Sequence, residues 1–92
     1  MDIRFYLDEF DEPHIHMHRV TETEVEEILR GPLEDRSGAE GTRVAIGQTA
    51  AGRFIRVIYV PEQDRDSIFV ITAYDLGPKA LKALRRRLRR RR

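Results

Sequence analysis

Cysteine is absent from this chain, and so is any long apolar run. Without cysteine there is no disulfide and no thiolate zinc site, which fits a reducing compartment. No stretch approaches the roughly 18 apolar residues of a membrane-spanning helix. The N-terminal residues also lack the charged-then-apolar pattern of a signal peptide. We therefore expect a cytoplasmic protein that does not enter a membrane.

Acidic residues are missing from residues 77–92, which carry nine positive charges. The whole chain has 17 basic and 16 acidic residues, so the remainder holds eight basic residues against all sixteen acids. The formal net charge of +1 hides a body near −8 and a tail near +9. A segment this basic is expected to bind a polyanion, which could be RNA or DNA, an acidic partner, or the acidic body of the chain itself.

The 92 residues are enough for a single domain with one core, and no internal repeat divides them. Alternating apolar residues predict a short strand over residues 3–7. Pro13 favours the start of a short helix over residues 14–18. A second helix follows, because Thr21 and Glu24 fit a capping box in which each side chain accepts from the other's backbone N–H.

Gly31 and Pro32 end that helix, and the polar, glycine-containing residues 33–41 predict a loop. Three strand patterns follow, over residues 42–49, 54–60 and 67–74. Their connections are too short for a parallel crossover, so neighbouring strands are antiparallel. An arginine-rich helix over about residues 78–92 completes the chain, with the leucines at positions 81, 84 and 88 on its buried side. The predicted order is β-α-α-β-β-β-α, an α+β fold with helices packed on a small antiparallel sheet.

Five sequence segments carry a resemblance to a known family. They are residues 18–29, 43–49, 52–53, 57–59 and 68–73. Their order and spacing resemble those of BrnT-like proteins, the toxins of bacterial type II toxin–antitoxin modules, which are similar to RelE-type ribonucleases. Two positions depart from that pattern: Arg19 stands where the family usually has glycine, and Tyr74 stands where it usually has arginine.

The resemblance implies a RelE-like fold and RNA cleavage without a metal or other cofactor. In that chemistry the ribose 2′-OH attacks the adjacent phosphate. A base takes the 2′ proton, an acid protonates the leaving 5′ oxygen, and cations stabilise the extra negative charge. The resemblance also implies RNA, free or on the ribosome, as the substrate and an antitoxin protein as a partner.

Four residues are the candidates for catalysis: His18, Arg53, Arg56 and Tyr74. Imidazole ordinarily titrates near neutral pH, so His18 suits acid–base work, although it could instead cap the short helix. Arg53 and Arg56 suit bidentate contact with phosphate. Arg56 lies within an apolar strand, and it could instead pair with an acid of the Glu-rich helix. Tyr74 could act on a nucleotide or simply pack at the edge of the core.

The residues predicted to bind nucleic acid are Arg43, Arg85, Arg86, Arg89 and Arg92. Most belong to the basic tail, where each phosphate contact would increase the salt dependence of binding. A basic helix could instead neutralise the acidic body of its own chain or of a neighbouring copy.

His14, His16 and His18 form an H-x-H-x-H pattern. On a strand all three would point to one side and could hold zinc, whereas on a helix only His14 and His18 share a face. Because Pro13 favours a helix and no second cluster supplies further ligands, we predict no metal site.

Two other functions fit the same residues. The chain could be a nucleic-acid-binding module that does not cut, and salt-sensitive binding without products would favour that. It could also be an interaction protein, such as a homo-oligomer in which basic tails meet acidic bodies. A mass that falls at high salt would favour this third function.

Overall fold

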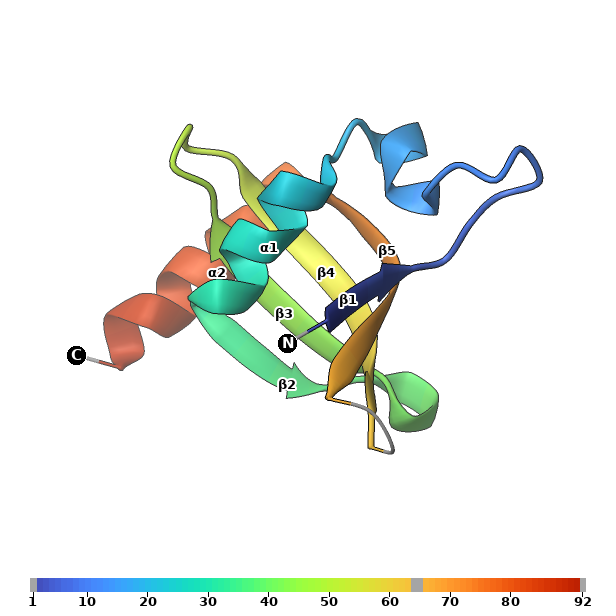
Figure 1. Ribbon diagram of the computed structural model, residues 1–92. Helices are drawn as coiled ribbons and strands as arrows, with labels where there is room; N and C mark the ends of the chain where they lie inside the picture. Colours follow the sequence, from blue (N-terminus) through green and yellow to red (C-terminus); the bar gives the residue numbers. More distant parts are fainter. Residues whose placement is uncertain (1, 64–65, 92) are drawn as a thin grey trace.

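A five-stranded sheet forms the centre of this α+β protein (Figure 1). The computed structural model describes residues 2–63 and 66–91. The strands are β1 (Asp2–Phe5), β2 (Glu34–Ser37), β3 (Arg43–Gln48), β4 (Phe54–Glu62) and β5 (Ser67–Asp75). The helices are α1 (Glu22–Arg30) and α2 (Pro78–Arg90), with short 3₁₀ helices η1 (His14–His18) and η2 (Ala39–Gly41). The order across the sheet is β1-β5-β4-β3-β2, and the predicted α+β class is confirmed.

The prediction of a wholly antiparallel sheet is wrong, because the sheet is mixed. β1 pairs in parallel with β5, where Ile3 lies opposite Ile68. All the other elements except α2 lie between these two strands in the sequence, which leaves ample chain for a parallel pairing. β5 is apolar on both faces, and β1 covers part of its outer edge.

The predicted loop over residues 33–41 is also wrong in part, because it contains β2. This strand pairs antiparallel with β3, with Glu34 opposite Ile46. Only Glu34 of its four residues is buried, so the segment has no apolar alternation from which a strand could be recognised.

Local signals predict α1 and the central strands correctly. The Thr21 hydroxyl accepts from the Glu24 backbone N–H at 3.1 Å, and the Glu24 carboxylate accepts from the Thr21 backbone N–H at 3.0 Å. A tight turn joins β3 to β4, in which the Thr49 N–H donates to the Arg53 carbonyl oxygen at 2.8 Å. Gly52 lies in this turn at φ 96°, a conformation that favours glycine.

The main core lies between α1 and one face of the sheet. Val25 and Ile28 of α1 are fully buried in one cluster with Ile55 and Val57 of β4. Each such side chain contributes about 1.5–3 kcal/mol through burial. A Cβ at Gly47 would lie 3.2 Å from the Ile28 Cδ1 atom, so glycine there allows α1 to approach β3 closely.

α2 lies against the opposite face, behind the sheet in Figure 1. Its predicted apolar stripe is confirmed, because Leu84 is fully buried and Leu81 and Leu88 are half-buried. The Glu34 side chain, which is only 3 % exposed, accepts from Arg87 Nε at 2.7 Å and from Arg91 Nη2 at 3.1 Å. Two ion pairs therefore join α2 to the edge strand β2. No helix among the described residues is long and apolar enough to span a membrane.

Candidate functional site

Four aromatic rings lie in a row between the N-terminal loop and β5. The centroids of the Tyr6 and His14 rings are 6.0 Å apart, those of His14 and His18 are 5.4 Å apart, and those of His18 and Tyr74 are 5.8 Å apart. Arg56 continues the row, with its guanidinium carbon 5.9 Å from the Tyr74 ring centroid. We call these five residues the ring line.

Backbone pairing holds the ring line in place. The Tyr6 N–H donates to a β5 carbonyl oxygen, that of Val70, at 2.8 Å, and the His14 N–H donates to the Tyr6 carbonyl oxygen at 2.8 Å. These bonds place η1 along the part of β5 that β1 does not cover. Tyr74 and Arg56 are direct partners in the β4–β5 register, so both side chains leave the same face of the sheet.

Arg56 has no acidic partner within the described residues, and its Nε atom is buried without a hydrogen bond there. The alternative that it pairs with an acid of α1 is wrong, because α1 covers the other face of the sheet. Arg56 alternates along β4 with Ile55 and Val57, which face α1. Tyr74 lies between this guanidinium and the His18 ring. A guanidinium with unused donors is well suited to bind phosphate.

Arg53 lies outside the ring line, and its guanidinium is occupied. Nε and Nη2 donate to the two Asp75 oxygens at 2.8 and 3.0 Å. Nη1 donates to Glu24 at 2.8 Å and to the Arg19 carbonyl oxygen at 2.7 Å. The hydrogen bonds to Asp75 and then Glu24 raise the pKa of Arg53. This geometry gives Arg53 a structural role at the meeting point of α1, β5 and the end of η1.

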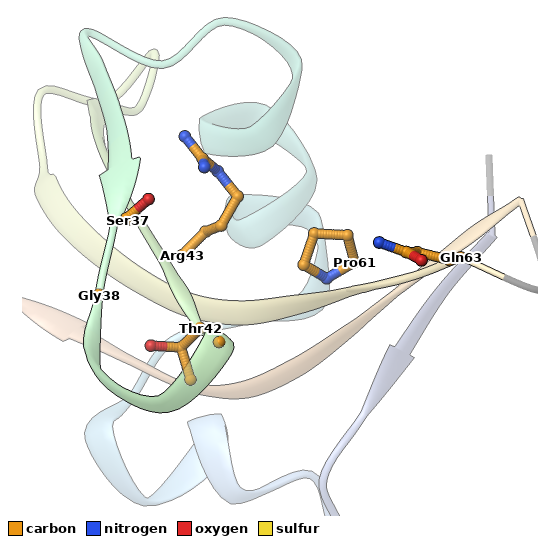
Figure 2. A pocket seen from close by; sticks show the side chains of 7 residues that line it. Ser37, Gly38, Thr42, Arg43, Pro61 and Gln63 are labelled. Atoms are coloured by element: carbon orange, nitrogen blue, oxygen red, sulfur yellow. The ribbon is translucent and has the colours of Figure 1, made fainter.

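Arg43 lies at the other end of the sheet, beside an open pocket of about 390 Å³ (Figure 2). The pocket is lined by Ser37, Gly38, Gly41, Thr42, Arg43, Pro61 and Gln63. Arg43 Nε donates to Asp35 at 2.9 Å, and this hydrogen bond raises the pKa of Arg43. Arg43 is the one charged side chain among these lining residues, so the pocket brings together no acid–base pair.

The solvent side of α2 carries six cations, which we call the basic face. They are Lys79, Lys82, Arg85, Arg86, Arg89 and Arg90. All are exposed, and none forms an ion pair within the part of the chain that the structure describes. The predicted residues at positions 85, 86 and 89 belong to this face, whereas Arg92 lies outside the described residues.

The basic face approaches β4 at Arg85, in the middle of α2. The Arg85 guanidinium carbon lies 5.7 Å from the Phe54 ring centroid. Phe54 and Arg56 are two residues apart on β4 and therefore point to the same side of the sheet. Arg85 and Arg56 therefore lie on the same side of the sheet.

His16 points away from the ring line. Its Nε2 atom lies 2.6 Å from Glu22 Oε1, and this hydrogen bond raises the pKa of His16. Within residues 2–63 and 66–91, no three histidine, aspartate or glutamate side chains are placed to hold a metal ion.

Two members of the ring line, Tyr6 and His14, were not among the predicted catalytic residues. His14 was noted only as a metal ligand, although its spacing from His18 places the two rings together in η1. Tyr6 follows β1 directly, and the sequence gives no signal that the chain returns to place His14 beside it.

Comparison of the chain with protein family models, with curated proteins and with solved structures found no match. The BrnT-like resemblance therefore depends on the order and spacing of the sequence motifs alone.

Proposed function

We propose that this chain is a BrnT-like, RelE-related protein that binds RNA and cleaves it without a metal. The observation that carries the proposal is the ring line. It brings together two imidazoles, two phenols and an arginine that has no acidic partner among the described residues. Of the four predicted catalytic residues, His18, Arg56 and Tyr74 belong to it.

The basic face and the aromatic rings suit a single RNA strand. Lysine and arginine neutralise phosphates along a backbone, and exposed rings stack on unpaired bases. The exposed Tyr6 and the half-buried Tyr74 lie at either side of the two histidines. A strand that crosses α2 and then the ring line would meet cations first and rings second.

The two histidines can share the proton transfers of the cleavage step. Imidazole takes up and releases protons near neutral pH, so one ring can accept the 2′-OH proton while the other donates to the 5′ oxygen. As the 2′ oxygen bonds to phosphorus, the bond from phosphorus to the 5′ oxygen breaks and a 2′,3′-cyclic phosphate results. Arg56 would stabilise the added negative charge on the phosphate.

End-labelled RNA in EDTA tests this mechanism. The unmodified protein is expected to give fragments ending in a 2′,3′-cyclic phosphate. His18→Ala or Arg56→Ala is expected to slow their formation by about 100-fold. The first change removes a proton-transfer group, and the second removes a group that binds the phosphate. His16→Ala is the matched control, since this histidine of the same turn faces Glu22. Equal rates in all four proteins would rule out the ring line as the catalytic site.

RNA binding without cleavage is the second candidate function. It is favoured by the basic face, which needs no imidazole to hold phosphates. Arg86→Ala combined with Arg89→Ala is expected to reduce the slope of log affinity against log salt by about 1.4, at about 0.7 per phosphate contact on a single strand. Arg30→Ala, which removes an exposed cation from α1, is the control and should leave the slope unchanged. Salt-sensitive binding with intact RNA would select this function.

A further inference from the structure

Exposed apolar side chains are concentrated near the N-terminus. Tyr6, Leu7, Phe10 and Met17 are 51 %, 47 %, 77 % and 67 % exposed, and they are four of the five large exposed apolar residues among those described. Several exposed apolar side chains in one region of a small protein are typical of an interaction site. Only Tyr6 among them belongs to the ring line, so the proposed cleavage leaves the other three without a role.

The loop that displays Phe10 is held in one shape. The Asp8 carboxylate accepts from the Phe10 N–H at 2.8 Å and from the Glu12 N–H at 3.1 Å. The Asp8 N–H donates to the Glu12 carbonyl oxygen at 2.8 Å, and a bridge between Leu7 and Pro13 closes the base. A loop that is already ordered loses little conformational entropy when a partner binds.

The chemistry around Phe10 selects a cationic partner. Four acids surround it in sequence, Asp8, Glu9, Asp11 and Glu12, and residues 8–12 contain no base. An aromatic ring among carboxylates attracts arginine, whose guanidinium can bind both the ring face and an acid. Arginine lies over a phenylalanine ring twice within the chain, where Arg4 lies 5.7 Å from the Phe69 ring and Arg85 lies 5.7 Å from the Phe54 ring. Arg4 also binds an acid, Glu62.

The basic face of α2 has the complementary charge. Its six cations have no ion-pair partner within the described residues, and the chain is divided into an acidic body and a basic tail. The two surfaces cannot meet within one molecule. In Figure 1 the loop projects at one end, in blue, and α2 lies at the other end, in red, on a molecule 39 Å long. We infer that the basic face of one copy docks on the Phe10 loop of a second copy.

This contact joins two different surfaces, so it is head-to-tail and leaves one free surface of each kind at the ends of every open assembly. Its strength comes from opposite charges on solvent-exposed groups, which salt screens. RNA and the Phe10 loop would compete for the same basic face. Self-association would therefore keep the basic face occupied until RNA displaces the Phe10 loop from it.

Sedimentation velocity of the full chain, without RNA, tests the inference. In about 50 mM salt the mean mass should exceed the 10.8 kDa of one chain and rise with protein concentration. In about 500 mM salt it should fall to that of the monomer. Glu26→Lys, a charge reversal at an exposed acid of α1, is the control and should still associate.

A mixing experiment identifies the two surfaces. A loop variant carries Glu9→Lys and Phe10→Ser, and a tail variant carries Arg86→Glu and Arg89→Glu. Each alone should be monomeric, because each lacks one surface. Mixed in equal amounts they should form a dimer that grows no further, because the intact tail of the first meets the intact loop of the second.

Three results would overturn the inference: a monomer at every concentration in low salt, association that survives high salt, or association that persists in the loop variant. Since no RNA is present, none of these results affects the proposed function. Added single-stranded RNA should also dissociate the assemblies, and assemblies that instead keep their mass with RNA bound would contradict the shared use of α2.

Discussion

Replacing Arg53 with alanine is expected to lower the free energy of unfolding by about 3 kcal/mol. Its guanidinium joins Glu24 at the start of α1, Asp75 at the end of β5 and the carbonyl oxygen of Arg19 after η1. Alanine would leave all three acceptors without this donor. The Glu24 and Asp75 side chains are 20 % and 54 % exposed, so the loss belongs at the low end of the range for buried ion pairs.

Urea unfolding with an unchanged m-value would measure this loss directly. Arg53→Lys should recover only part of it, because a single ammonium group cannot reproduce the forked contact with Asp75. Arg56→Ala, three residues further along the chain on β4, is the matched control. Having no acidic partner within the described residues, it should change the free energy of unfolding by less than about 1 kcal/mol. An Arg53→Ala protein of full stability that fails to cleave RNA would instead support the phosphate contact expected from the sequence.

The contrast between Arg53 and Arg56 shows why the sequence alone could not assign the site. Both arginines precede or interrupt an apolar strand, and both are suited to phosphate. Their roles differ because Arg53 comes just before β4, within reach of Glu24 and Asp75, whereas Arg56 leaves the face opposite α1. Which acids reach Arg53 depends on contacts between residues 22 or more positions apart, and no local pattern contains that information.

The same distinction between local and long-range information explains which parts of the fold could be predicted from the sequence. The capping box of α1 and the strand pattern over residues 54–60 depend on neighbours within a few residues, and both predict the observed element correctly. The partner of β1 is β5, more than 60 residues away, and no local pattern identifies this pairing. Tyr6 and His14 were overlooked for the same reason, because only the path of the loop brings them together.

Replacing Glu34 with alanine is expected to lower the free energy of unfolding by about 3 kcal/mol, because it leaves two arginines without their shared carboxylate. Glu34 is the buried residue of β2, and it binds Arg87 of α2 and Arg91, the residue that follows α2. Amide hydrogen exchange should increase most within α2, because only its leucines would then hold this helix against the sheet. Glu26→Ala, at an exposed acid without these contacts, is the control. Exchange that rises equally in β4 and α2 would contradict a local anchoring role.

Acid should also weaken the contact of Glu34 with Arg87 and Arg91, and the direction of this pH effect follows from the pKa of Glu34. The hydrogen bond from Arg87 lowers this pKa below its ordinary value of 4.5, even though burial alone would raise it. The carboxylate therefore contributes its full stabilisation above pH 4.5, and this contribution is lost as the pH falls through the lower pKa of the folded state. Glu34→Gln cannot titrate, so its stability should fall less steeply than that of the unmodified protein below pH 4.5. If the free energies of unfolding of the two proteins fall in parallel as the pH is lowered, the acid sensitivity comes instead from Asp75 and Glu24, whose pKa values are also lowered.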